Sequence, residues 1–559
     1  MYKIVTHSAF YVLKYVPDSK MPHIQRLMLQ EPQLALHHSL NKNGAMVQTY
    51  KAYIYHIVKY ICAGAERTVS EFQLNQDIND MIDLEMELST IVTPTAFSNS
   101  QDNYKVTTVE QFQKIYDNHG GKHPHAMFDW LNKLKEEIGK PELDITKSEI
   151  IIVKYISYFT KLPKILKKYR SRTLVNYMAW NLVRSIIPLG DSKLAHIAFR
   201  FKQKMNSMNK DKTRSETCLE IPNLSEAISY EYIKNYFSEE TKKQVKTIVD
   251  LIINKMTEGV KSTVWMDEKI KTLLTQKIQN IGKLVGYPDY YSKSFIDQMY
   301  KDYRFGPNFM ESVLNFLKFN ANYNFRQIRR TFSRDRWVRR PTDVIASYIV
   351  TANSINIPAA ILQPPIFQID RPAVLNFAII GFIIAHEISH SFDIQGRKFD
   401  KDGNVIDSWS PEMIEIYRVL SLCFIDQYNK YPVPKLPNRK RICLDGYLTL
   451  GENIADTIAL LIAFHTYKQF KMENGNKDVR LPTLNEYTSE QLFFMYLAYF
   501  HCTNMNPKII EKKLKTDCHA PRQFRLIGSI SNNPDFGKAF NCTIGDPMYP
   551  ANRCSILVL

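Results

Sequence analysis

The chain has 559 residues, and 73 Lys and Arg against 56 Asp and Glu give it a formal net charge of +17. A hydrophobic fraction of 45% and a charged fraction of 23% exclude a disordered, collagen-like or coiled-coil protein. The length corresponds to roughly three to four domain equivalents, so two or more packed units are expected. Eight cysteines are too few for a disulfide-built scaffold but enough for several bridges in a secreted enzyme.

The segment 1–7 has neither the basic start nor the apolar run of a signal peptide. No stretch reaches the ~18–20 uninterrupted apolar residues that a membrane span needs, and 375–385 is too short. We therefore expect no membrane span in this chain. Asn223 and Asn541 begin glycosylation sequons, which matter only in a secretory compartment and often arise by chance.

Apolar residues at three-to-four spacing predict a mostly helical first part, and a helix ends before Gly286-Tyr-Pro288. The most basic segment, 161–172, lacks interleaved aromatic residues, which favours a solvated helix face or loop over a nucleic-acid site. No nucleic-acid partner is expected. The helices predicted in this part cover 48–63, 78–91, 241–256 and 261–285.

The pattern changes near Arg339. Residues 344–350 and 353–362 are β-rich and interrupted by small residues, as in edge strands, and two prolines then force a turn. An apolar helix is predicted over 373–392. The fold class is therefore mainly α (α+β), with a helical domain over 1–310 and a mixed domain over 311–559.

The sequence His386-Glu387-Ile388-Ser389-His390 occurs at the end of that apolar helix. Spacing of four places both imidazoles on one helix face, where they can share one metal ion. Glu387 is rotated by about 100° from His386, which suits a base rather than a third ligand. Two neutral imidazoles favour Zn²⁺ and leave room for a carboxylate and a water. The alternative is a pair of histidines that only caps an apolar helix.

Glu452 and Asp456 form a second pair at helical spacing of four. One carboxylate can bind the metal while the other accepts the N–H of a metal-binding histidine. Helix capping would explain this pair equally well in isolation, but much less well beside two histidines at metal-binding spacing. Near the C-terminus, His519 or Arg525 could donate to the oxyanion that forms in peptide hydrolysis, although spacing cannot show that either reaches the site.

At this point the sequence resembles the neprilysin and endothelin-converting-enzyme family of zinc metalloendopeptidases. The similarity covers most of the chain and is strongest from about residue 341 onward. The matching segments are 264–267, 286–288, 358–365, 386–393, 448–456, 491–494, 516–525 and 539–542.

The resemblance implies one Zn²⁺ per chain, bound by His386, His390 and Glu452, with Glu387 as general base. Asp456 would orient a zinc-binding histidine, His519 would stabilise the oxyanion, and Arg525 would hold a substrate carbonyl. The fold would be a helical cap domain and a thermolysin-like catalytic domain that enclose a cavity, so substrates would be oligopeptides. The residues implied for substrate binding are Ala346, through its backbone, and Ile366, Phe382 and Ile383, in a pocket for the apolar residue after the cleaved bond.

Four departures from the family pattern matter. Ile345 stands where the family has an Asn that can bridge two peptide groups, a loss of about 1–3 kcal/mol in binding. His501 replaces a Trp and would change a pocket wall. The family's C-terminal Trp is absent after Cys554, and the family's N-terminal tail, membrane anchor and first part of the ectodomain have no counterpart.

The resemblance therefore indicates an N-terminally incomplete member, extracellular or at the cell surface; the chain would be either a truncated gene product or isoform, which we favour, or a diverged paralogue. It implies a bridge between Cys423 and Cys554, whereas partners of Cys218, Cys502 and Cys542 would lie in the missing part. Cys62, Cys443 and Cys518 have no assigned partner.

The main hypothesis is a zinc endopeptidase that cleaves oligopeptides before apolar residues. The alternative is a catalytically weak or inactive zinc-binding member that acts as a peptide-binding protein, which Ile345 and the missing segment favour. A third hypothesis, a basic nucleic-acid-binding protein, is supported by the net charge alone. Homodimer formation stays open.

Overall fold

We describe the fold from a computed structural model. It describes residues 8–18, 24–35, 44–93, 104–139, 144–187, 190–206, 213, 215–216, 224–325, 328–329, 334–433, 443–476 and 480–559. The chain divides into two compact units, each built from separate stretches of sequence. The first contains 1–18, 23–224 and 299–331, and the second contains 19–22, 225–298 and 332–559.

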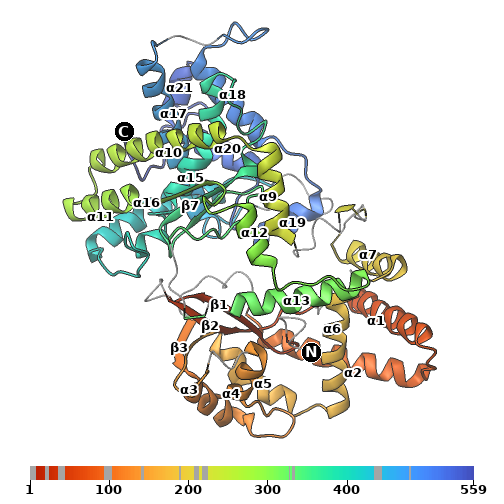
Figure 1. The fold of residues 1–559 in the computed structure, drawn as a ribbon. Helices are drawn as coiled ribbons and strands as arrows, with labels where there is room; N and C mark the ends of the chain where they lie inside the picture. Colours follow the sequence, from red (N-terminus) through yellow and green to blue (C-terminus); the bar gives the residue numbers. More distant parts are fainter. Residues whose placement is uncertain are drawn as a thin grey trace. The chain divides into compact units, whose positions relative to one another are not determined.

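The first unit combines one small sheet with helices (Figure 1). Its strand order is β1-β2-β4-β3, with β2 and β4 parallel and the other two pairs antiparallel. Its core includes the fully buried Trp130, Tyr50 and Phe159. The elements are β1 (Val12–Pro17), β2 (Gln25–Gln30), α1 (Gly44–Gly64), α2 (Glu71–Ile91), β3 (Tyr104–Thr108), α3 (Val109–Tyr116), η3 (Asp117–Gly121), α4 (Trp130–Ile138), β4 (Ile150–Lys154), α5 (Ile156–Leu166), α6 (Ser171–Ile186), α7 (Ser192–Asn206) and α13 (Phe309–Phe325).

The second unit is larger and mainly helical, with the three-stranded sheet β5-β7-β6. The parallel pair β5–β7 and the antiparallel pair β6–β7 leave β6 at the edge. Its elements are α9 (Ser225–Tyr236), α10 (Glu239–Ser262), α11 (Glu268–Gln279), β5 (Gly282–Gly286), β6 (Ser347–Ile349), β7 (Ser354–Pro358), η6 (Ala359–Ile361), α14 (Ala373–Asn376), η7 (Phe377–Gly381), α15 (Phe382–Ser389), η8 (Gly396–Lys398), α16 (Pro411–Asn429), α17 (Leu450–Glu473), α18 (Ser489–His501), α19 (Pro507–Thr516), α20 (Arg522–Ser531) and α21 (Pro534–Ala539). Helix α12 (Lys293–Tyr300) runs from the second unit into the first.

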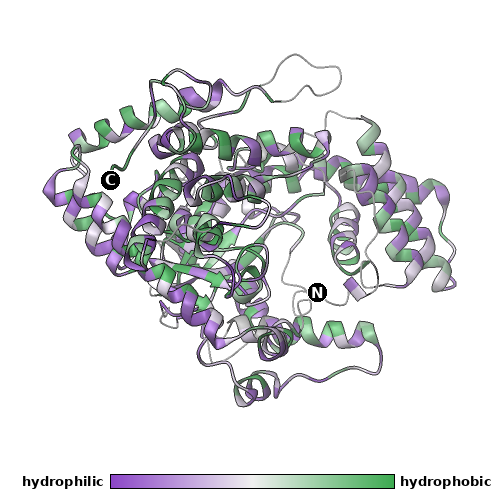
Figure 2. Cartoon of the chain, turned by 90° about the horizontal axis from the view of Figure 1, so that it is seen from above, coloured by the Kyte–Doolittle hydropathy of each residue, from purple (hydrophilic) through white to green (hydrophobic). Residues whose placement is uncertain are grey.

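The core of the second unit surrounds α17, which packs against α10, α15, α16 and α20. Along α10, apolar residues at three-to-four spacing, among them Ile252, Met256 and Val260, are buried, as an amphipathic helix requires. Figure 2 shows that many other helices also carry both hydrophilic and hydrophobic residues along their length. Helices α15 and α17 therefore lie within one buried apolar core.

The C-terminal residues of the chain also pack on α10 and the turn that follows it. Trp265 Nε1 donates a hydrogen bond to the carbonyl of Ile556, 2.8 Å away, and the Val558 amide donates to Thr263 Oγ1 at 3.2 Å. Leu557 is buried, and a Cβ on Gly259 would lie 2.9 Å from one of its methyl groups. The tail thus closes the second unit against a segment from the middle of the sequence.

The mainly helical fold predicted from the sequence is confirmed. The helices predicted over 48–63, 78–91 and 241–256 lie within α1, α2 and α10. The basic segment 161–172 spans the end of α5 and the start of α6, and its charged side chains are exposed. Within the described residues, no helix has both the length and the apolar character needed to cross a membrane.

Three expectations need correction. Residues 261–285 are not one helix, because the Asp267 side chain caps a new helix, α11, and Gly282–Gly286 pairs with β7 as β5. The sheet of the first unit was not predicted, since an apolar run such as Ile150–Lys154 cannot be told from a buried helix by periodicity. The predicted boundary at residue 310 differs from the observed division: 225–298 belongs to the second unit because the apolar face of α10 packs on α15 and α17.

Candidate metal centre

Helix α15 presents two histidines from a buried apolar segment. A turn of π-helix, η7, leads into α15, and Ile384, Ala385 and Ile388 are fully buried. His386 lies in the last turn of α15, and His390 follows the helix as its C-cap residue. Their Nε2 atoms are 3.2 Å apart, so the two rings converge on one point as the spacing predicts.

The third donor comes from the first turn of α17, which packs directly against α15. Glu452 Oε2 lies 3.2 Å from His386 Nε2 and 3.7 Å from His390 Nε2. Donors on a tetrahedral Zn²⁺, with bonds of about 2.0–2.1 Å, are about 3.3 Å apart. Two imidazoles and one carboxylate with these separations fit a zinc ion and leave its fourth position open.

A carboxylate holds the second ring nitrogen of each of these histidines. Asp456 Oδ1 lies 2.9 Å from His386 Nδ1, and His390 Nδ1 donates to Asp393 Oδ2 at 2.8 Å. Such contacts fix the tautomer that presents Nε2 to a metal. Asp456 was predicted for this role, whereas Asp393 was missed, although it stands only three residues after His390 in the sequence.

Asp456 is completely buried, and Arg525 neutralises its charge. Arg525 Nε and one Nη donate to the two carboxylate oxygens of Asp456, each at 2.7 Å. Burial alone would raise the pKa of Asp456, but Arg525 and His386 hold it well below its usual range. The implied contact of Arg525 with a substrate carbonyl stays a prediction.

The histidine and glutamate side chains of the centre influence one another strongly. Burial lowers the pKa of His386, yet Asp456 and Glu452 outweigh this effect and raise it to about 9. Burial would raise the pKa of Glu452, but the surrounding histidines hold it far below its usual range. Glu452 is therefore a carboxylate, and His386 retains a proton that a bound metal would displace.

Glu387 lies on α15, directly after His386 in the sequence and three residues before His390. Its side chain is half-buried. His519, from the loop that precedes α20, brings its Nε2 to 3.1 Å from Glu452 Oε2. Hydrogen bonding with Cys518 and Glu452 raises the pKa of His519 to about 11. His519 therefore reaches the centre as a cation, which its position in the sequence alone could not show.

The loop after α15 returns to the helix and packs tightly against it. A Cβ on Gly396 would lie 1.8 Å from the carbonyl oxygen of His390, so only glycine fits there. The amide of Gly396 donates to Asp393 Oδ1 at 2.7 Å. The buried Lys277 Nζ donates to the carbonyls of Gly396 and Phe399 at 2.6 and 2.7 Å, and burial lowers its pKa to about 7. Sequence reasoning missed Lys277 and Gly396.

The residues predicted to contact substrate lie close to this centre or in the core beside it. Phe382 is buried one turn before His386, its ring 6.3 Å from that imidazole, and Ile383 follows it. The buried His501 packs its ring 5.6 Å from Phe382 and donates from Nδ1 to the carbonyl of Leu497. Ala346 is buried just before the edge strand β6, and Ile366 packs against the core. Their contact with a peptide stays a prediction.

The predicted disulfide between Cys423 and Cys554 is confirmed. Cys62, Cys443, Cys502, Cys518 and Cys542 are free. Cys218 and Asn223 lie outside the described residues. Asn541 is exposed, and its glycosylation stays a prediction.

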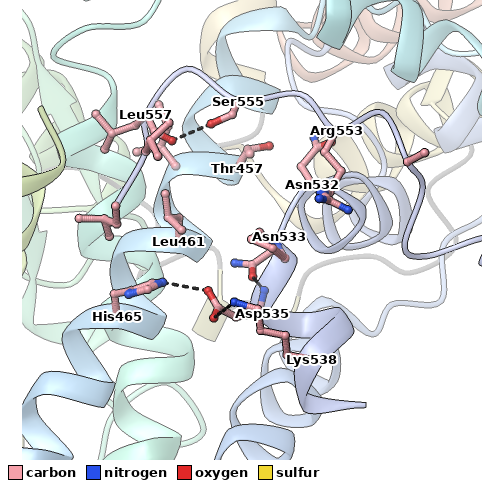
Figure 3. A pocket seen from close by; sticks show the side chains of 15 residues that line it. Thr457, Leu461, His465, Asn532, Asn533, Asp535, Lys538, Arg553, Ser555 and Leu557 are labelled. Atoms are coloured by element: carbon pink, nitrogen blue, oxygen red, sulfur yellow. Dashed lines mark hydrogen bonds and ion pairs between the residues drawn. The ribbon is translucent and has the colours of Figure 1, made fainter. Parts of the chain in front are cut away.

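A separate pocket of about 400 Å³ lies on the opposite face of α17, between that helix, α21 and the C-terminal residues (Figure 3). His465 Nε2 and Asp535 Oδ2 pair across it at 2.8 Å. None of its lining residues takes part in the metal centre, so we assign it no role in the reaction.

Two helices that bring a His-Glu-x-x-His sequence and a distant glutamate onto one point define the centre of a metallopeptidase. Comparison with known proteins agrees with this class. Models of peptidase family M13 match residues 2–288 and 346–556. The chain belongs to peptidase family M13.

Several characterised proteins are similar to this chain. It is 33% identical to mouse membrane metallo-endopeptidase-like 1 over 435 residues, which is 77% of this chain and 56% of that protein. It is 30% identical to rat endothelin-converting enzyme 1 over 560 residues, covering 98% of this chain and 70% of the rat enzyme. The fold matches that of the Mycobacterium tuberculosis zinc metalloprotease Zmp1, solved with an inhibitor, at a TM-score of 0.84 and 22% identity, over 98% of this chain and 81% of that structure.

Proposed function

We propose that the chain is a zinc-dependent endopeptidase that hydrolyses oligopeptides. The convergence of His386, His390 and Glu452 beside the half-buried Glu387 is the observation that carries this proposal. When bound, zinc would act as a Lewis acid on the scissile carbonyl and lower the pKa of a water molecule. The similarity to peptidase family M13 supports the same activity.

The side chains of the centre divide the remaining work. Glu387 takes a proton from the attacking water and delivers it to the leaving amine. His519, a cation beside Glu452, donates to the oxyanion that develops on the carbonyl. Asp456 keeps His386 in the metal-binding tautomer. Arg525 balances the negative charge of Asp456, and the same guanidinium group would also contact a substrate carbonyl.

Substitution of Glu387 by Gln tests the reaction. Cleavage of a quenched oligopeptide should fall by roughly 10²–10⁴-fold, because the amide cannot accept the proton, while the zinc content stays at one ion per chain. Glu412→Gln, at an exposed position on α16, is the matched control and should cleave normally. Unchanged cleavage by the Glu387 variant would falsify the proposal.

We further infer that cleavage occurs on the amino side of apolar residues. Phe382 and Ile383 are buried apolar side chains in the turn before His386, and Ile366 packs against the same core. A peptide series that varies only the residue after the scissile bond should show at least about tenfold higher kcat/KM for Phe or Leu than for Gly. Equal rates along the series would exclude this pocket.

A weak or inactive peptide-binding protein is the second candidate, and Ile345 favours it. Ile345 is 47% exposed two residues before the edge strand β6, where a peptide could add as a further strand. Restoring an amide with Ile345→Asn should raise kcat/KM by about 5- to 160-fold, equivalent to about 1–3 kcal/mol. Stoichiometric peptide binding without cleavage by both forms would select this second candidate.

The Cys423–Cys554 disulfide supports an oxidising, extracellular or cell-surface location. Expression through the secretory pathway should then yield glycan on Asn541, which mass spectrometry of the tryptic peptide would detect. A homodimer stays open, and sedimentation of the purified chain would decide it.

A further inference from the structure

Cys518 is a free, exposed cysteine next to the oxyanion-facing histidine and beside a metal-facing carboxylate. Its Sγ lies 3.7 Å from Glu452 Oε1 and 3.5 Å from His519 Nδ1. Glu452 therefore faces two ways: Oε2 towards His386, His390 and His519, and Oε1 towards the thiol. The proposed reaction uses neither Cys518 nor Oε1.

These separations match those of a metal site. One donor atom from each of Glu452, Cys518 and His519 lies within 4.8 Å of the others. On a tetrahedral Zn²⁺, with bonds of about 2.3 Å to sulfur and about 2.1 Å to oxygen, the two donors are about 3.6 Å apart. The observed 3.7 Å needs almost no movement of either side chain.

His519 is held in the way that the other two metal-facing histidines are held. Its Nδ1 lies 2.9 Å from Asp517 Oδ1, just as Asp456 and Asp393 hold His386 and His390. This contact leaves Nε2, 3.1 Å from Glu452 Oε2, as the nitrogen that a metal would reach by displacing its proton. A thiol, a carboxylate and an oriented imidazole together form a donor set that prefers soft divalent ions.

We propose that Cys518, His519 and Glu452 form a second metal site that binds Zn²⁺ or Cd²⁺ and inhibits the enzyme. Glu452 would be shared by the two ions, because its oxygens contact His386 and His390 on one side and Cys518 and His519 on the other. The site is weaker than the first, because Cys518 and His519 are exposed and Glu452 is shared. Inhibition rests on the proposed function, since the second ion withdraws His519 from the substrate carbonyl.

Cadmium titration of the full chain, loaded first with one equivalent of zinc, tests the site without reference to activity. A second equivalent should bind with a sulfur-to-cadmium charge-transfer band in the ultraviolet, and excess zinc should abolish that band by competition. Cys518→Ser and Cys518→Ala should lose the band and weaken cadmium binding at the second site by more than about tenfold. Loss of a residue that only supports a metal ligand already weakens metal binding by about tenfold, so loss of a ligand should cost more. Cys443→Ser, at another exposed free cysteine, is the matched control and should keep the band.

Peptide cleavage provides the second readout. Excess zinc should lower the activity of the native chain and of the Cys443 variant below their own activity with one equivalent of zinc, but should not lower that of the Cys518 variants in the same comparison. A native chain that binds only one ion, or a band that persists without Cys518, would overturn the inference. The Glu387→Gln variant separates the two proposals, because it should still bind the second ion although it cannot cleave peptide. If the native chain shows the cadmium band but does not cleave peptide, the peptidase proposal alone is refuted.

Discussion

Exchange of the buried Asp456 for asparagine probes how the metal centre is supported. The substitution keeps the shape of the side chain but removes the charge that faces Arg525 and one of the oxygens that accept its hydrogen bonds, both 2.7 Å long. Loss of a carboxylate behind a metal-binding histidine weakens metal binding by roughly 10- to 100-fold, or about 1.4–2.8 kcal/mol. We expect a loss at the upper end of that range, because the uncompensated cation of Arg525 would also repel the ion.

The same substitution should lower the free energy of unfolding. Removing one partner of a buried ion pair costs about 3–5 kcal/mol. The Arg525 side chain is 18% exposed, so water recovers part of this loss and about 3 kcal/mol is the expected effect. Competition with a chromophoric chelator would measure zinc affinity, and denaturant unfolding of the zinc-free protein would measure stability.

Asp393→Asn is the matched comparison. Asp393 holds His390 at a similar distance, 2.8 Å, but within the described residues no arginine side chain donates to its carboxylate. Its loss should weaken zinc binding by only about tenfold. Adding Arg525→Met to the Asp456 variant should recover part of the zinc affinity, since it removes the unpaired charge. Equal losses in the two aspartate variants, or no recovery in the double variant, would refute the role assigned to the Arg525–Asp456 pair.

Three further outcomes are expected. Gly396→Ala should displace the backbone of His390, cost about 1–3 kcal/mol in stability and reduce zinc occupancy measured by atomic absorption; full occupancy would show that the loop yields instead. Replacing Cys423 and Cys554 by alanine should lower the free energy of unfolding by about 2–5 kcal/mol, whereas reducing agent should not alter that variant further. Burial raises the pKa of Glu31 to about 7, so the folded state binds its proton more tightly than the unfolded state does. Stability of the first unit should therefore fall between about pH 4.5 and 7, by about 1.4 kcal/mol per unit of pKa shift at most, and Glu31→Gln should flatten this dependence in thermal unfolding measured against pH.

The side chains that converge at the candidate metal centre could be predicted in pairs from the sequence, because helical spacing fixes which side chains share a face. His386 and His390 are one turn apart on or next to α15, and Glu452 and Asp456 are one turn apart on α17, so each pair needed only its own helix. Spacing alone does not show that α15 packs against α17 and brings the two pairs together. Only the resemblance to a family indicated that they meet.

Features that depend on tertiary contact escaped prediction. Lys277 reaches the loop after α15 across 119 residues of sequence, and nothing near Lys277 indicates that its ammonium group is buried. Cys518 was recognised as a cysteine without a partner, but its distance from Glu452 depends on how the chain before α20 returns to α17. The assignment of 225–298 to the second unit likewise depends on packing of α10 rather than on any change in composition.

The tail that packs on α10 has a consequence for biosynthesis. Trp265 and Ile556 are 291 residues apart, and a ribosome that adds about 5–20 residues per second needs about 15–60 s to make the second after the first. During that interval the apolar residues of α10 have been synthesised but lack α15, α17 and the tail that cover them. Nascent chains of this protein should therefore be strong clients of chaperones that bind exposed apolar helices, and they should leave them only when synthesis has passed Val558.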